Sequence, residues 1–307
     1  MKNSINMIVQ GEALMAEALK NKCTDTMAKA EAILAEASIR DRVEAKASNK
    51  RISAEALINS TLQKQIARGD HPIKLTKLFT SNNPKILKSL KQGYQTIGLS
   101  LAPASINGIV NLCTSASKEC LTDCLNLSGR GVMNQAQTAR KRKALELIND
   151  PLSFLTQLCA EIAKAEAKAI KADLILVIRL NVLSDLQWEK IKLEGDRSIF
   201  DLFPHIQFYD YSKHDLSKRS LPDNYSVTFS YTGHNKKKAE KLIGLGHTIA
   251  VVFNHKRISM PDLFLGHKTA SGDDHDLVFI HPRSTVLMLT AKGKALKAIG
   301  SPFVIGS

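Results

Sequence analysis

No run of apolar residues in this sequence approaches the roughly 18 that a membrane-spanning helix needs. The opening stretch MKNSINMIVQGEALMAEALKNK interrupts its apolar positions with polar ones, unlike the continuous apolar core of a secretory leader. These absences exclude a membrane-spanning protein and argue against export. We therefore expect a cytoplasmic protein with no membrane partner.

Cysteine and aromatic residues are scarce, with five Cys, one Trp and an aromatic content of 5%. An odd number of cysteines in a reducing cytosol argues against a disulfide framework and favours metal or redox chemistry. The motifs G-x-x-x-x-G-K-[ST], G-x-S-x-G and H-E-x-x-H are also missing. The sequence thus gives no support for the P-loop, α/β-hydrolase or zincin families.

Positive charge is abundant, with 43 Lys and Arg against 29 Asp and Glu and a formal net charge of +14. A broad positive field favours a polyanionic partner, so nucleic acid, either DNA or RNA, is the partner we expect. The apolar content of 44% in 307 residues is sufficient for a substantial core. The sequence does not indicate an oligomeric state.

The pattern of apolar residues predicts an N-terminal helical segment, residues 1–75, and an α/β domain, residues 76–307. Residues 5–70 are rich in Ala, Glu, Lys and Leu, and Gly69 and Pro72 then supply a helix stop. Further helices are expected over 134–171, with a break at 149–151, and over 234–246. The expected strands are 96–102, 174–180, 206–211, 225–231, 248–253, 277–280 and 285–290.

Alternating strands and helices predict a parallel sheet, either a partial (β/α) barrel or an open, mostly parallel sheet. In both arrangements the carboxyl ends of the strands meet at one edge, where such folds bind ligands. Polar side chains follow two of the expected strands, in RLNVLSD and YDYSK. We therefore predict catalytic or substrate-binding roles for Arg179, Asn181, Asp185, Asp210 and Lys213. A structural ion pair between Arg179 and Asp185 is an equally good explanation.

Cys113, Cys120 and Cys124 form a C-x6-C-x3-C pattern in the loop after the first expected strand. Thiolates at short spacing are ligands for an iron–sulfur cluster or for zinc, so these three are the predicted metal ligands. The alternative is that they are small buried residues that line a turn. Cys23 and Cys159 fall on expected helices, where packing explains them.

A basic cluster follows directly after the cysteine loop, around the start of the expected helix. Basic side chains near a helix N-terminus suit phosphate, so we predict nucleic-acid contacts there, although a solvated helix face is the simpler alternative. The cluster consists of Arg130, Arg140, Lys141, Arg142 and Lys143. Further along, SGDDHDLVFIHP gathers carboxylates and imidazoles that suit a hard metal or an acid/base pair, or else a polar turn.

The succession of GLSLAPASINGIVNLC, CLTDCLNLSGRG, VIRLNVLSDLQWE, NYSVTFSYTGHN, GDDHDLVFIHP and TAKGKA resembles a family of phage- and plasmid-borne proteins. That family is related to the group named after mycobacteriophage gene product 88. The resemblance covers roughly residues 95–307. It implies a mobile element in a bacterial host and a shared cysteine loop.

A more distant resemblance concerns architecture. Radical S-adenosylmethionine enzymes also place three cluster cysteines in the loop after the first strand of a partial barrel. Their usual C-x3-C-x2-C spacing is narrower than the spacing here, and no glycine-rich methionine-binding stretch follows the second expected strand. These departures argue against S-adenosylmethionine as a cofactor.

Two functions fit these observations. The first is a mobile-element protein, an enzyme or derived from one, with an iron–sulfur or metal-binding loop at the open end of an α/β barrel, acting on or with nucleic acid. The second is a non-enzymatic DNA- or RNA-binding protein of replication or maintenance, whose cysteine loop is structural. Metal analysis separates the two.

Overall fold

The computed structural model describes residues 52–81, 87–297 and 300–306. Residue contacts divide the chain between Ser53 and Ala54, and everything that follows concerns the compact unit that begins at Ala54. The predicted helices over residues 5–51 lie outside the described residues. No helix in the described ranges is long and apolar enough to cross a membrane.

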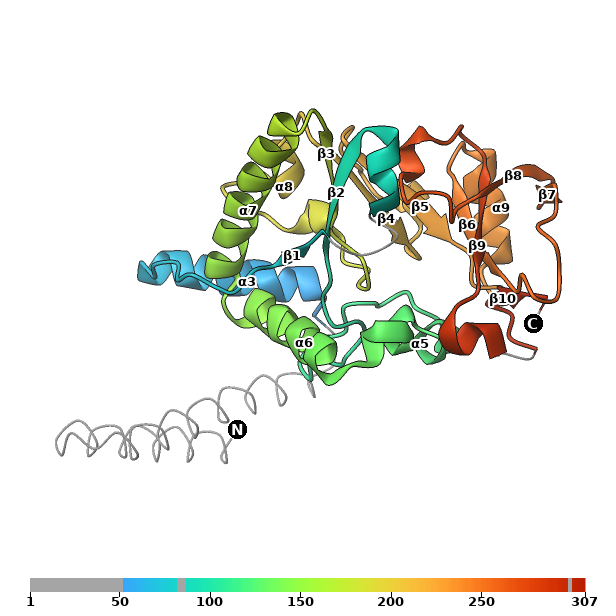
Figure 1. The fold of residues 1–307 in the computed structure, drawn as a ribbon. Helices are drawn as coiled ribbons and strands as arrows, with labels where there is room; N and C mark the ends of the chain where they lie inside the picture. Colours follow the sequence, from blue (N-terminus) through green and yellow to red (C-terminus); the bar gives the residue numbers. More distant parts are fainter. Residues whose placement is uncertain (1–51, 82–86, 298–299, 307) are drawn as a thin grey trace, which may run out of the picture. The chain divides into compact units, whose positions relative to one another are not determined.

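Ten strands of the described residues form one open sheet, which Figure 1 shows. Five of them, β2 to β6, are consecutive parallel neighbours, and β9 and β8 extend the parallel part beyond β6. Short antiparallel strands, β1 and β7, end the sheet on either side, so it does not close. Of the two expected arrangements, the open sheet is confirmed. The strands are β1 (Phe79–Thr80), β2 (Tyr94–Leu99), β3 (Ile175–Arg179), β4 (Gln207–Ser212), β5 (Tyr225–Ser230), β6 (Ile249–Phe253), β7 (Leu263–Phe264), β8 (His267–Ser271), β9 (Val286–Thr290) and β10 (Val304–Ile305).

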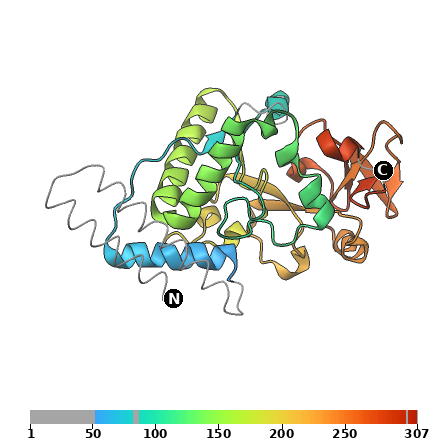
Figure 2. The ribbon, with the colours of Figure 1, turned by 90° about the horizontal axis from the view of Figure 1, so that it is seen from below.

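Helices cover one face of this sheet because consecutive parallel strands with crossovers of one hand place every connection on the same side. Figure 2 shows α6 and α7 side by side with α3 across their ends. The apolar side chains of the strands that face the helices, such as Ile178, Phe208 and Phe229, are fully buried. The helices are α3 (Ala54–Arg68), α5 (Lys118–Thr122), α6 (Asn134–Asn149), α7 (Pro151–Lys171), α8 (Ile199–Leu202) and α9 (Lys236–Gly244), and the 3-10 helices are η1 (Lys88–Gln92), η2 (Leu125–Leu127), η3 (Gly129–Val132), η4 (Trp188–Lys190), η5 (Leu216–Lys218), η6 (Val278–Ile280) and η7 (Gly293–Lys297).

The break between α6 and α7 confirms the predicted interruption at 149–151. Asp150 caps α7 by accepting a hydrogen bond from the Ser153 N–H, and Pro151 occupies the first turn, where its missing N–H costs nothing. Along α7 the side chains of Phe154, Leu158 and Ile162 are buried. Their spacing of four residues turns one apolar stripe toward the sheet.

The opposite face of the sheet is covered by the connection between β8 and β9. Leu277 and Val278 pack there against Val177 of β3 and Tyr209 of β4. The prediction of a strand over 277–280 is therefore wrong, since this segment contains the 3-10 helix η6. A run of apolar residues indicates that a segment is buried. A segment can be buried against the face of a sheet without pairing with a neighbouring strand. The other six expected strands are confirmed by β2, β3, β4, β5, β6 and β9.

Helix α3 belongs to the same compact unit as the sheet. Its Ile58 and Leu62 are buried in the main core together with residues of α6 and α7. Polar contacts add to this packing, because the Gln65 amide donates to the Asp150 carboxylate at 2.8 Å and Glu55 accepts from the Gln187 N–H at 2.9 Å. Helix α3 therefore belongs to the unit that begins at Ala54, while the domain boundary at residue 75 stays a prediction.

Candidate functional site

The carboxyl ends of the parallel strands meet at the edge of the sheet that carries the cysteine loop and α5 (Figure 1). The loop follows β2, Arg179 ends β3, and Lys213 comes directly after β4. The expectation that these segments share one edge is confirmed by the parallel register of β2, β3 and β4. The polar residues at this edge fall into two groups with different surroundings.

The first group is organised by Asn181, which is buried just after β3. Its side-chain oxygen accepts from Leu186 N–H at 3.0 Å and from the indole N–H of Trp188 at 3.3 Å. Its amide group donates to the Leu186 carbonyl at 2.9 Å. The loop after β3 therefore folds around this amide, which explains why the only tryptophan is fully buried nearby.

Asp210 lies next to Asn181 and has no solvent exposure. It accepts a hydrogen bond from the Asn181 N–H at 2.7 Å and another from the Tyr225 hydroxyl at 3.0 Å. Burial raises the pKa of Asp210 to about 7, and the Arg179 guanidinium, 3.9 Å away, counteracts part of that rise. Burial therefore favours the neutral form of this carboxyl group far more than in an exposed aspartate.

Arg179 points to the face of the sheet that η6 covers. Its guanidinium binds the Asp276 carboxylate at 2.7 Å and stacks over the Tyr211 ring at 4.8 Å. Burial alone would lower the pKa of Arg179, yet Asp276 and the tyrosines hold it above its usual range. The structural ion pair of Arg179 is thus made with Asp276, from the GDDHD stretch.

The second group gathers around Lys213. Its ammonium hydrogen-bonds the Cys120 sulfur and interacts electrostatically with Cys113 and with Asp185. Cys124 interacts with Lys213 as well, and with both other thiols of the loop. Burial would lower the pKa of Lys213, but these neighbours raise it above its ordinary value. All three cysteines of the loop therefore lie within electrostatic reach of one cation, while the Cys113 thiol donates to the Leu183 carbonyl at 3.6 Å.

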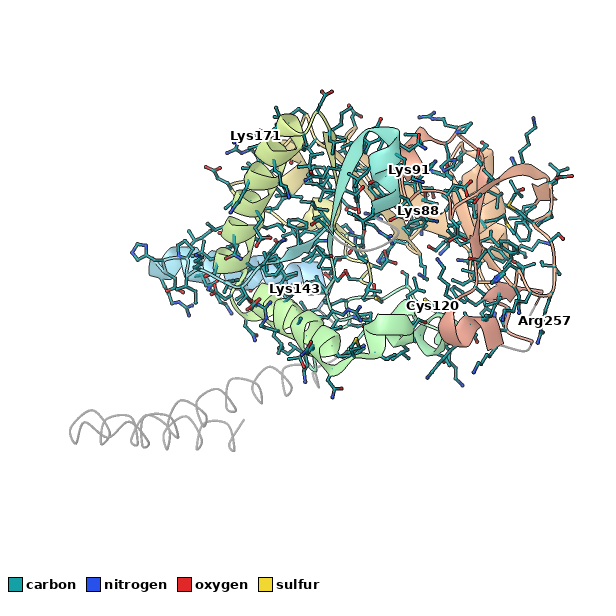
Figure 3. The ribbon with its side chains drawn as sticks, viewed as in Figure 1. Lys88, Lys91, Cys120, Lys143, Lys171 and Arg257 are labelled. Atoms are coloured by element: carbon teal, nitrogen blue, oxygen red, sulfur yellow. The ribbon has the colours of Figure 1, made fainter. Side chains whose placement is uncertain are left out.

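Burial controls the ionisation of two of these thiols. It raises the pKa of Cys113 to about 12 and raises the pKa of Cys124 as well. Both are therefore neutral at physiological pH without a bound cation. Cys120 lies on α5 and is partly exposed (Figure 3). Across the described ranges, no group of three or more His, Cys, Asp or Glu side chains is arranged to hold a metal ion.

Asp185 links the loop after β3 to the start of the segment after β4. Its Oδ2 accepts from the Lys213 N–H at 2.9 Å, and its own N–H donates to the Leu112 carbonyl at 2.8 Å. Its other oxygen, Oδ1, is buried and accepts no hydrogen bond from the residues that the structure describes. A buried carboxylate oxygen without a donor is costly, so Oδ1 is an acceptor that remains available at this edge of the sheet.

Two residues at this edge were not predicted from the sequence. The Ser115 hydroxyl lies 3.0 Å from Nδ1 of His214, and Nε2 of that ring lies 3.1 Å from the Asp185 carbonyl oxygen. No local pattern joins a serine of the cysteine loop to a histidine that is 99 residues away. The only sequence feature that pointed to this contact was the position of His214 shortly after an expected strand.

The basic cluster on α6 is largely engaged with the protein itself. Lys143 is buried and donates to the Leu78 carbonyl at 2.9 Å, and Figure 3 shows it on α6. Arg140 binds the Asn126 side chain at 2.7 Å, and Arg142 pairs with Glu146 at 2.6 Å. Lys141 is exposed, while the side chain of Arg130 lies outside the description. The nucleic-acid role of this cluster stays a prediction.

The family model described as gene product 88 matches residues 74–305. No curated protein and no solved structure matches the chain. The likeness to radical S-adenosylmethionine barrels stays a prediction that depends on the cysteine loop after β2. The matched range runs from before β1 to the end of β10, so it includes the whole sheet, the cysteine loop and α6. The model spans well over half of the sequence, and the chain therefore belongs to the gene product 88 family.

Proposed function

We propose that this protein binds an iron–sulfur cluster, or alternatively zinc, through Cys113, Cys120 and Cys124 at the carboxyl edge of its sheet. The observation that supports the proposal is that all three thiols lie within electrostatic reach of the Lys213 ammonium. Soft thiolate ligands suit both groups. Three ligands from one loop would leave part of the group open to a substrate or partner.

Metal binding would change the ionisation of the thiols. Cys113 and Cys124 hold their protons in the absence of metal because burial raises their pKa values. A metal ion or cluster would replace those protons, since only thiolates act as ligands. Lys213 and Arg140 already lie within electrostatic reach of these sulfurs and would offset the charge of the three thiolates. An iron–sulfur cluster would supply electron transfer, and zinc would supply a Lewis acid.

The neighbouring polar residues would form the substrate-binding side of the site. Asp185 offers a buried acceptor, Oδ1, that the described residues leave without a donor. Arg179, Asn181 and Asp210 bind one another and other protein groups, so we assign them to positioning this edge. Lys213 is assigned to charge compensation at the thiols.

Anaerobic purification followed by iron, acid-labile sulfide and zinc analysis tests the proposal. Protein with stoichiometric metal, lost in Cys120→Ser and Cys124→Ser, is the expected result. Cys159→Ser is the matched control, because Cys159 is a partly buried thiol of α7, away from the loop. Colourless wild-type protein without iron or zinc would rule the proposal out, and so would metal that persists in both loop variants.

Nucleic-acid binding is the second proposed function, and the net charge of +14 favours it. Exposed lysines occur on α9, where Lys236, Lys237 and Lys241 lie on the surface, and on α6 at Lys141. Affinity for a DNA or RNA oligonucleotide should fall steeply with salt, because neutralised phosphates release counterions. Replacing Lys237 and Lys241 by Ala should reduce the salt slope by about one for each phosphate that the variant no longer neutralises. Affinity that does not change with salt would exclude this function.

A further inference from the structure

The side chains of Ser115 and His214 lie within hydrogen-bonding distance at the carboxyl edge of the sheet. Ser115 is exposed in the cysteine loop, and its Oγ lies 3.0 Å from Nδ1 of His214. This distance is within the range that nucleophile and base adopt in serine hydrolases. The two residues come from different segments, and β4 ends two residues before His214. The register of the sheet therefore creates the pair.

The partner of the other ring nitrogen decides the tautomer of His214. Nε2 lies 3.1 Å from the main-chain carbonyl oxygen of Asp185, which can only accept a hydrogen bond. The Nε2 atom must therefore carry the proton in the neutral ring. Nδ1 is then the unprotonated nitrogen, and the Ser115 hydroxyl donates to it. A nucleophile, a base and a group that orients the base are thus all present.

The position of His214 is held from several directions. Its own N–H donates to the Ser212 hydroxyl at 3.1 Å. The preceding N–H, that of Lys213, donates to the Asp185 carboxylate at 2.9 Å. Asp185 therefore holds the segment through its carboxylate and orients the ring through its carbonyl oxygen. Such support by fixed neighbours is what a catalytic base requires.

We propose that Ser115 and His214 are the nucleophile and general base of an esterase site that acts on carboxylic esters, preferentially anionic ones. The Ser115 Oγ attacks the ester carbonyl carbon while its proton moves to Nδ1 of His214. Collapse of the tetrahedral intermediate breaks the bond to the leaving alcohol, which takes that proton, and leaves an acyl-serine. Water then attacks the acyl group with His214 as base, which releases the carboxylic acid and restores both residues.

The preference for anionic substrates follows from the surrounding charge. Lys213 precedes His214, and Lys118 is exposed in the same loop as Ser115. Both cations favour negative charge on the substrate. The reaction needs no metal, so it does not depend on the proposed cluster.

Metal-free protein, prepared with a chelator, should hydrolyse 4-nitrophenyl acetate and should react with a fluorophosphonate probe at Ser115, as located by peptide mass spectrometry. The hydrolysis rate should fall by about 100-fold in Ser115→Ala, given the usual contribution of such groups. His214→Gln should lose activity to a similar extent, and Trp188 fluorescence reports whether this variant is folded. Ser105→Ala is the matched control, since Ser105 is another exposed serine of the same loop.

The outcomes separate this activity from a purely structural contact between loop and strand. Probe on Ser115, together with hydrolysis lost in both site variants and kept in the control, supports the proposal. Wild-type protein that neither hydrolyses the ester nor takes up the probe would overturn it. Hydrolysis that survives in Ser115→Ala would also overturn it, as would a probe attached elsewhere. The metal content of the same samples is a separate readout and decides the cluster proposal independently.

Discussion

Replacing Asn181 by Ala should cost more stability than almost any other single change at this edge of the sheet. The side chain is 3% exposed and satisfies the Leu186 N–H and the Trp188 indole N–H, neither of which can turn toward water. Each buried donor left without a partner costs about 1–3 kcal/mol. We therefore expect a loss of about 4 kcal/mol, a large part of the 5–15 kcal/mol typical of a folded domain.

Urea unfolding followed by tryptophan fluorescence measures this loss directly, because the chain has one Trp and it belongs to the same network. Asn59→Ala is the matched control. That amide also joins two segments, through the Lys190 carbonyl at 2.8 Å and the Lys192 N–H at 3.0 Å, but water can replace it at its more exposed position. The control should lose about 1 kcal/mol or less. Equal midpoints for the two variants, at an unchanged m value, would refute the reasoning.

Three further predictions concern other parts of the fold. Asp210 has a pKa of about 7 when folded against 3.8 as its ordinary value, so its contribution to stability is present below about pH 4 and is lost as the pH rises through 7. Asp210→Asn should make the melting temperature depend less on pH between pH 4 and 7. A pH dependence equal to that of the wild type would contradict the assigned pKa. Lys143→Ala should destabilise the fold by about 1–3 kcal/mol, since it leaves the Leu78 carbonyl without its donor. Lys141→Ala, the control, should leave the melting temperature unchanged. Equal effects of the two substitutions would contradict the placement of these lysines. A chain that begins at residue 52 should melt cooperatively. A chain that begins at residue 71 should melt at lower temperature or precipitate, because it lacks the buried residues of α3. Identical melting of the two chains would show that α3 adds nothing to the core.

We expect the two groups at the carboxyl edge to respond differently to substitution. The network of Asn181 and Asp210 is satisfied by protein groups, so substitutions there should act through stability. In the second group the thiols lie near the Lys213 ammonium, and one carboxylate oxygen of Asp185 has no hydrogen-bond donor among the described residues. Substitutions in this second group should change binding or chemistry more than stability.

Local sequence was sufficient to predict most of the secondary structure. The runs that became β3, β5 and β6 are rich in β-branched and aromatic residues, which favour strands. The break between α6 and α7 was readable because Asp and Pro at 150 and 151 form a local N-terminal signal. The cysteine loop and its position after the first parallel strand were also visible, since alternating strands and helices fix where loops meet.

Only the tertiary structure decided which polar groups meet. Arg179 pairs with Asp276 across 97 residues, and Ser115 meets His214 across 99. The burial of Lys143 depends on a carbonyl group 65 residues away, so one lysine of the basic run became part of the core. Local patterns encode how much of a segment is buried. They do not encode the register of distant strands, and that register selects the partner of each charge.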